Sequence, residues 1–155
     1  MLTIIGCGNS NRTDDGAGVY VAQRLLQQLR ERPKQNVRVF DAGTGGMEIM
    51  FQARGATRLI IIDASQTGSE AGAIYEVPGA ELENPREASY SLHDFRWDHA
   101  LYAGRQIFRA DFPQDVTVYL IEAANLGLGL DMTEPVRQAA ETVIAKLTEI
   151  IAGYD

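Results

Sequence analysis

The sequence predicts an α/β fold, in which short apolar strands alternate with amphipathic helices around a mostly parallel sheet. The length of 155 residues suits a single domain spanning 1–155. Hydrophobic residues make up 45% of the chain and charged residues 23%, the usual balance of a globular protein with a packed core. Short apolar runs alternate with helical patterns, and we expect about five strands, at 2–5, 37–40, 58–63, 73–77 and 116–121.

The residues in and around two of these runs indicate their places in the sheet. Residues 58–63 are apolar on both faces, which is typical of a central strand covered by helices on each side. The run 73–77 lies between Gly72 and Pro78, which favours a strand at an edge. The polar and acidic stretch 79–90 is expected to be an exposed loop.

Helices are expected between the strands. Their approximate ranges are 14–32, 47–53 and 91–108, with a last helix starting near Thr133. The first has apolar residues at i, i+4 spacing and is stopped by Pro33. Ser91 is the expected cap of the third helix, and Pro135 fits the first turn of the last.

Charge and cysteine content limit the possible partners and the compartment. The chain has 14 Lys and Arg against 21 Asp and Glu, a net charge of −7, which disfavours binding to a nucleic-acid backbone. The single cysteine, Cys7, cannot form an intramolecular disulfide and fits a reducing compartment, so we expect a cytoplasmic protein. No stretch reaches the ~18 apolar residues of a membrane span, so no insertion into a membrane is expected. The size favours a monomer.

Carboxylates mark the edge of the sheet where a ligand would bind. Ligands of open α/β sheets bind beyond the carboxyl ends of the strands, and Asp14, Asp15 and Asp63 are expected there. An ionised carboxylate beside a core is costly unless it is exposed, hydrogen-bonded or bound to a cation. Plainer roles stay open: Asp14 as the N-cap of the first helix, Asp15 as a charge favourable to the helix dipole, and Asp63 as a turn cap.

A nucleotide site is the first alternative. The glycine-rich turn after the first strand, Gly6-Cys7-Gly8, resembles one that cradles pyrophosphate, but Asn11 stands at the third glycine position. The helix also opens with two aspartates, which would repel a phosphate at its N-terminus. The pattern therefore favours a cation over a nucleotide.

The two histidines of the chain are His93 and His99. Six residues apart on one helix, they would face different directions, so they cannot chelate one metal together. His93, beside a loop, is the better candidate ligand, and His99 is assigned a structural role. Cys7 has no basic neighbour in sequence and fits a small buried thiol. The residues alone thus indicate an acidic crevice that holds a divalent metal with two carboxylates and a histidine.

Five segments carry a resemblance to the NiFe hydrogenase maturation endopeptidases. The run 6–18 resembles the family's opening pattern of Gly-x-Gly-Asn followed by Asp-(Asp/Glu)-Gly-x-Gly. Residues 41–48 resemble its Asp-x-Gly-Thr-x-Gly-Met/Leu-Glu loop, and 62–64 the end of its third strand. Residues 91–93 resemble its Ser-x-His segment, and 127–130 its Gly-x-Gly-Leu turn. The resemblance spans essentially the whole chain.

The resemblance implies a compact αβα sandwich and an endopeptidase activity. Members of this family remove a C-terminal extension from the precursor of a hydrogenase large subunit once nickel has been inserted. Residue by residue, the family's metal contacts fall on Asp15, Asp63 and His93, which would be both ligands and catalytic residues. The nickel would come from the substrate and assist the attack of water on the peptide bond. A non-enzymatic nickel-binding chaperone for the large subunit would use the same ligands and stays open.

The loop after the second strand is the expected substrate-binding element. Asp41, Gly43, Thr44 and Gly45 are predicted to shape the floor of the crevice or to bind the extended tail of the substrate. The glycines also have a plainer role, since they permit a tight turn.

Overall fold

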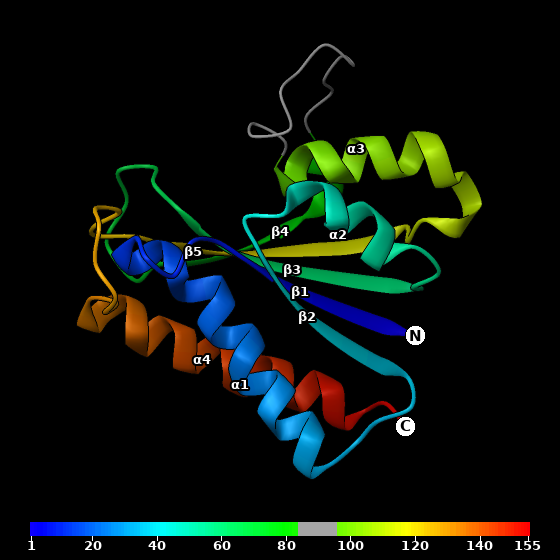
Figure 1. Cartoon of the computed structure of the whole chain (residues 1–155), viewed down its shortest axis with the longest axis horizontal. Coiled ribbons are helices and arrows are strands. Elements are labelled where there is room, and N and C mark those ends of the chain that lie inside the picture. The colour runs from blue at the N-terminus through cyan, green and yellow to red at the C-terminus, as the bar shows by residue number, and fades with distance from the viewer. Residues whose placement is uncertain (84–95) are drawn as a thin grey trace.

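The computed structural model describes residues 1–83 and 96–155, and within them five strands form one sheet in the order β2-β1-β3-β5-β4 (Figure 1). Their bounds are β1 (Leu2–Cys7), β2 (Val37–Gly43), β3 (Arg58–Ser65), β4 (Ile74–Pro78) and β5 (Asp115–Glu122). The first three strands and β5 pair in parallel, and β4 lies antiparallel at the edge. The predicted mostly parallel sheet, with its edge strand near 73–77, is confirmed.

Helices cover both faces of the sheet and form the αβα sandwich. Two longer helices, α1 (Ala17–Glu31) and α4 (Glu134–Ala152), pack together on one face (Figure 1). Two shorter helices, α2 (Gly46–Ala53) and α3 (Trp97–Phe108), pack together on the other. No helix in the described ranges 1–83 and 96–155 is long and apolar enough to cross a membrane.

The alternation of side chains along β3 builds a separate core on each face. Ile60 and Ile62 belong to the buried cluster beneath α1 and α4, whereas Leu59 and Ile61 belong to the cluster beneath α2 and α3. Successive residues of a strand point to opposite faces, so a strand buried on both sides must be apolar throughout. This is the pattern that predicted a central strand at 58–63.

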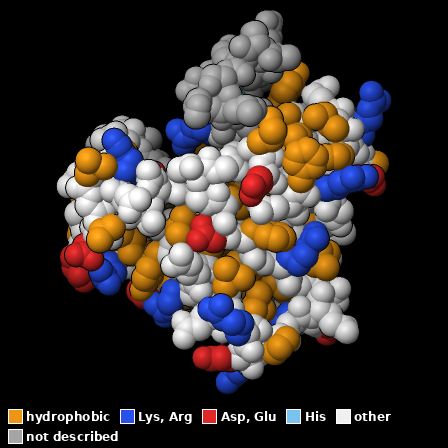
Figure 2. Space-filling model, viewed as in Figure 1, with side chains coloured by type: hydrophobic (Ala, Val, Ile, Leu, Met, Phe, Trp, Pro, Cys, Tyr) orange, Lys and Arg blue, Asp and Glu red, His pale blue; other side chains and the backbone are white. Residues whose placement is uncertain are grey.

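The α2–α3 layer has apolar side chains on its exposed surface. Met47 and Phe51 on α2 and Ile107 on α3 are exposed apolar side chains. Figure 2 shows hydrophobic side chains gathered over these two helices. Phe51 packs edge-on against the ring of Phe108, with 5.7 Å between the ring centroids.

Two helix starts differ from the sequence prediction. A 3₁₀ turn, η1 (Thr13–Gly16), precedes α1, so the helix itself begins at Ala17 and not near Asp14. The expected helix over 91–108 is wrong as one element, because Arg96 is extended and α3 begins at Trp97. The backbone N–H of Arg96 donates to His99 Nδ1 at 3.1 Å, and this local cap sets the start of α3. Ser91 and His93 lie outside the described residues.

The strand order creates a crevice at the carboxyl edge of the sheet. β2 lies on one side of β1 and β3 on the other, so the connections after β1 and β3 separate at this point. Such a switch in strand order is where open α/β sheets bind their ligands. β1, β2 and β3 place the candidate residues Cys7, Gly43 and Asp63 at or near their carboxyl ends, around this crevice.

Candidate functional site

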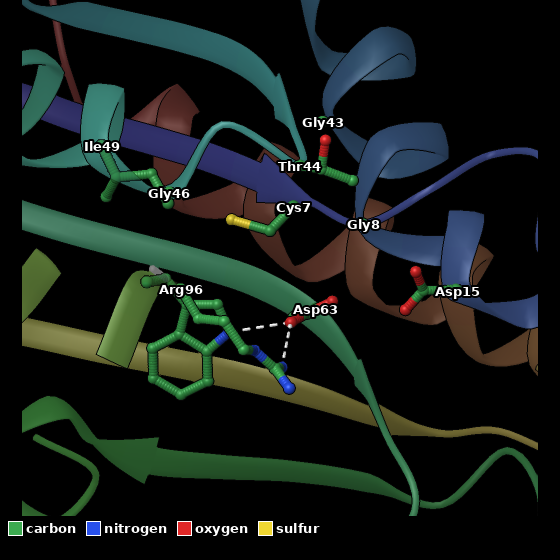
Figure 3. Close-up of a pocket in the computed structure, with 10 residues that line it drawn as sticks. Cys7, Gly8, Asp15, Gly43, Thr44, Gly46, Ile49, Asp63 and Arg96 are labelled. Carbon is green, nitrogen blue, oxygen red and sulfur yellow. Dashed lines mark hydrogen bonds and ion pairs between the residues drawn. The ribbon is translucent and has the colours of Figure 1, made fainter. Parts of the chain in front are cut away.

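A hollow of about 260 Å³ lies at the carboxyl edge of the sheet (Figure 3). Two of its lining residues are the predicted acids Asp15 and Asp63, which come from η1 and β3. The others come from the ends of β1 and β2, from α2, and from the start of α3; they are Cys7, Gly8, Gly43, Thr44, Gly46, Ile49, Arg96 and Trp97. The fold thus brings two of the three predicted metal ligands to one hollow.

Asp63 is held in a fixed orientation by donors on three sides. Its side chain is buried, with 4% of the residue exposed. Oδ1 accepts the backbone N–H of Ala64 at 2.8 Å, and Oδ2 accepts the indole Nε1–H of Trp97 at 2.7 Å. Arg96 Nη2 donates to the same Oδ2 at 3.2 Å (Figure 3).

Burial dominates the electrostatics of this carboxyl group. Removal from water raises the pKa of Asp63 to about 7, and the nearby charge of Asp15 raises it too. The hydrogen bond from Trp97, the charge of Arg96 and the Ala64 N–H act in the opposite direction. Asp63 is therefore a carboxyl group that changes its charge near neutral pH.

Asp15 lines the same hollow from η1. Its Oδ2 accepts the backbone N–H of Asn9 at 2.9 Å, which fixes the side chain over the turn after β1. Gly8 lies between the two acids: a Cβ there would stand 1.9 Å from the backbone oxygen of Asp15 and 3.6 Å from Asp63 Oδ1. Gly8 also has a φ of +133°, so a side chain is excluded on both grounds. The glycine therefore lets the backbone of η1 at Asp15 pack against the turn after β1, beside Asp63.

Asp14 is not the N-cap of α1, which corrects the plainer role considered for it. The residue is fully buried, and η1 turns its side chain away from the hollow toward the loop after β5. Oδ2 accepts the backbone N–H groups of Ala124 and Asn125 at 2.8 and 3.0 Å, and Oδ1 accepts that of Thr133 at 2.7 Å. The Thr133 hydroxyl donates as well. Asp14 thus links η1 to the segment between β5 and α4 through hydrogen bonds.

The loop after β2 lies where the sequence pattern placed it. Gly43 and Thr44 line the hollow, and Asp41, with the same two residues, lines an adjoining one. Asp41 Oδ1 accepts the Gly43 N–H at 3.1 Å, which holds the turn at a φ of +52°. Gly45 lines neither hollow; its N–H donates to Ala42 O at 2.9 Å inside the turn.

The structure adds two residues to the site, Arg96 and Trp97. Both reach Asp63 from the start of α3, more than 30 positions away in sequence. No spacing pattern connects them to β3. The one available signal is that Trp97 is the only tryptophan of the chain, and a buried indole N–H needs an acceptor.

Cys7 also lines the hollow, yet its thiol is not an activated nucleophile. The residue is 4% exposed. Burial first, and then the charge of Asp63, raise the pKa of the Cys7 thiol well above its ordinary value. A thiol held protonated in this way is a poor nucleophile, in agreement with the small buried thiol expected from the sequence.

The third predicted ligand, His93, lies outside the described residues. Within 1–83 and 96–155, no group of three His, Cys, Asp or Glu side chains is placed to hold a metal ion. A metal centre at Asp15 and Asp63 therefore stays a prediction that needs a further donor. His99 is buried and accepts the N–H of Arg96, a structural role within the cap of α3.

Comparisons with known proteins agree with this architecture. The chain is 26% identical over 160 residues to the coenzyme F420 hydrogenase subunit delta of Methanothermobacter thermautotrophicus, covering 97% of this chain and 94% of that protein. It is 28% identical over 153 residues to the hydrogenase 2 maturation protease of Escherichia coli, covering 96% and 91%. The solved structure of the hydrogenase maturating endopeptidase HybD from E. coli superposes with a TM-score of 0.72 at 25% identity, covering 96% and 92%.

A family model described as hydrogenase maturation protease matches residues 19–150. This range includes Asp63 and the loop after β2 but begins just after Asp15. The match covers well over half of the chain. The chain therefore belongs to the hydrogenase maturation protease family.

Proposed function

We propose that this protein is an endopeptidase that removes the C-terminal extension from the precursor of a NiFe hydrogenase large subunit. The observation that carries the proposal is the meeting of Asp15 and Asp63 in one hollow at the carboxyl edge of the sheet. Family membership supports the reaction class, and the name of the E. coli relative, hydrogenase 2 maturation protease, supports the substrate class.

The chemistry of the hollow fits a metal ion delivered by the substrate. Carboxylate oxygen and imidazole nitrogen are ligands that nickel(II) accepts, and Asp15, Asp63 and the predicted His93 would supply them. Asp63 Oδ1 accepts one hydrogen bond, from Ala64, and faces Gly8 across the hollow. Arg96, whose side chain is 62% exposed, can swing away from Oδ2 when a cation arrives. A nickel ion bound there would polarise the scissile carbonyl or acidify a water molecule.

Attack by water is the step that these residues support. Cys7 carries the stronger of the two neutral nucleophiles that line the hollow, the other being the Thr44 hydroxyl, and the raised pKa of Cys7 keeps the thiol protonated. Trp97 acts as a positioning residue, because its bond to Oδ2 fixes the plane of the Asp63 carboxylate. A precursor without nickel would offer nothing for these ligands to hold, so cleavage would report that nickel insertion is complete.

Two further properties belong to this proposal. The protein acts in the cytoplasm, in agreement with its single cysteine. It acts as a monomer, which sedimentation of the purified protein would test.

The direct test incubates the purified protein with nickel-loaded or nickel-free precursor and measures the intact mass of the large subunit. We expect the loaded precursor alone to lose its C-terminal extension, and Asp63→Asn to abolish the loss. Asp111→Asn changes an exposed aspartate outside the hollow and serves as the matched control. Equal trimming of both precursors would contradict the role of nickel. Binding without any trimming would favour the nickel-binding assembly chaperone instead.

A further inference from the structure

The candidate hollow is the first of three that adjoin one another along the start of α1. The second, of about 280 Å³, shares Gly8, Gly43 and Thr44 with the first. The third, also of about 280 Å³, shares Ser10, Val19 and Gln23 with the second. Because neighbouring hollows share lining residues, the three lie in a row along the start of α1. We call this row the channel; it starts at Asp15 and Asp63.

The far wall of the channel is the loop that follows β5. Leu130 and Met132 of this loop line the third hollow, opposite Tyr20 of α1. Figure 1 shows the loop beside the start of α1, although the two segments are more than 100 residues apart in sequence. The third hollow is therefore built between the start of α1 and the loop that leads from β5 to α4.

Hydrogen bonds hold this wall in place. Arg12 and Gly129 form a parallel β-bridge, in which Thr13 N–H donates to Gly129 O at 2.9 Å. Thr13 Oγ1 donates to Gly127 O at 2.6 Å. The three backbone bonds to Asp14 secure the two ends of the loop. A wall fixed by so many bonds is formed before any ligand arrives, which lowers the entropy cost of binding.

The walls have the chemistry of a peptide site. Leu130 is 79% exposed although its loop is anchored, and an exposed apolar side chain on a rigid loop lowers its free energy when a partner covers it. In the second hollow, Asp41 accepts a bond from Gln23 Nε2 at 3.1 Å, so polar groups lie between the carboxylates of the first hollow and Leu130 and Met132 of the third. A row of hollows with different linings suits an extended chain, whose side chains occupy successive pockets.

We infer that the channel holds an extended segment of the substrate precursor next to its scissile bond, with an apolar side chain of that segment seated against Leu130 and Met132. The inference rests on the proposed function, because the first hollow is the proposed place of cleavage. It adds a second recognition site, distinct from the carboxylates, which selects the precursor by its sequence near the cleavage point.

The test fills the channel without touching the first hollow. Gln23 lies where the second and third hollows meet, and its side chain is exposed, so Gln23→Trp blocks the path with little effect on the core. Gln27→Trp is the matched control: the same substitution, equally exposed, one turn further along α1 and outside all three hollows. Trimming of the nickel-loaded precursor is followed by intact mass at several precursor concentrations.

We expect Gln23→Trp to raise KM about tenfold with kcat changed less than about twofold, since binding is lost and not chemistry. A second pair changes charge instead of volume. Leu130→Asp should raise KM similarly, whereas Leu128→Asp, at a neighbouring residue that is 85% exposed and outside the third hollow, should not. If wild type trims the precursor and both members of each pair behave alike, the inference is overturned and the proposed function stands. If wild type trims nothing, both fall.

Discussion

Asp14 and Asp63 are two buried carboxylates in very different surroundings. Asp14 is fully buried, and its oxygens accept three backbone N–H groups and a hydroxyl from the loop after β5. Asp63 is 4% exposed at one wall of a hollow, where one backbone N–H and two side chains donate to it. The first holds two segments together, and the second lies where a ligand in the hollow would contact it.

The difference indicates which features separate a structural acid from a candidate functional one. Backbone donors that surround an anion satisfy it permanently and fix the chain around it. A carboxyl group whose pKa is raised to about 7 has a charged state that is costly in the free protein, and a bound cation would relieve that cost. Burial alone therefore does not indicate function. The hydrogen-bond donors of the carboxylate, and whether a hollow lies beside it, are the features that distinguish the two residues.

The largest expected effect that distinguishes Asp63 from Asp14 is a loss of activity on substitution without a loss of the fold. We expect Asp63→Asn to lower kcat/KM for precursor trimming by about 10³-fold, because the amide cannot supply an anionic ligand or exchange a proton at that position. Near-ultraviolet circular dichroism of Trp97 would verify that the surroundings of Asp63 are intact. Trimming within tenfold of wild type would remove Asp63 from the reaction.

The pH dependence of the free energy of unfolding should differ between wild type and Asp63→Asn. Asp63 has a pKa of about 7 in the folded chain and about 3.9 in an unfolded one. Between these values the folded state retains a proton that the unfolded state releases, so rising pH lowers the free energy of unfolding. The loss is at most roughly 4 kcal/mol, and Asp63→Asn should abolish it. Urea denaturation from pH 4 to 8 would measure it, and parallel curves for the two proteins would contradict the raised pKa.

Substitution of Asp14, unlike that of Asp63, is expected to destabilise the fold. Asp14→Ala should lower the free energy of unfolding by about 3 kcal/mol, because the buried N–H groups of Ala124, Asn125 and Thr133 lose their acceptor. Urea denaturation is the measurement. Asp131→Ala, an exposed aspartate in the same loop, should cost less than about 0.5 kcal/mol. Equal costs would mean that Asp14 does not hold the loop.

The smallest expected effect concerns the donor from α3. Trp97→Phe removes the indole N–H that lowers the pKa of Asp63 while keeping an aromatic ring. The pKa of Asp63 should rise by about one unit. The pH profile of kcat/KM, which reports groups of the free enzyme, should shift to higher pH accordingly. An unchanged profile would show that the bond does not tune Asp63.

The predictable parts of the fold are those that depend on local pattern. The five strands, the edge position of β4 and the last helix follow from apolar runs and from Pro and Gly positions. Asp63 could also be predicted as a candidate site residue, since a charged residue in a buried apolar strand is unusual. The start of α3 could not be predicted, because the Arg96 N–H donates to His99 in a cap that contains none of the usual capping residues such as Ser or Asp.

Contacts across the chain could not be predicted. Asp14 and Thr133 are 119 residues apart, and Trp97 reaches Asp63 only because α3 packs beside α2 over the sheet. Asp14 and Asp15 are adjacent and chemically identical, and only the turn of η1 directs one to the loop and the other to the hollow. The position of His93, outside the described residues, stays a prediction.

The most direct test of the central claim is the intact mass of the hydrogenase large subunit in cells that lack this protein. The cells would be complemented with wild type, Asp63→Asn, His93→Ala or the control Asp111→Asn. We predict that the C-terminal extension is retained without the protein and with the first two variants, and is removed by wild type and the control. Removal of the extension in the uncomplemented cells, or by Asp63→Asn, would contradict the proposed hydrolysis at this site.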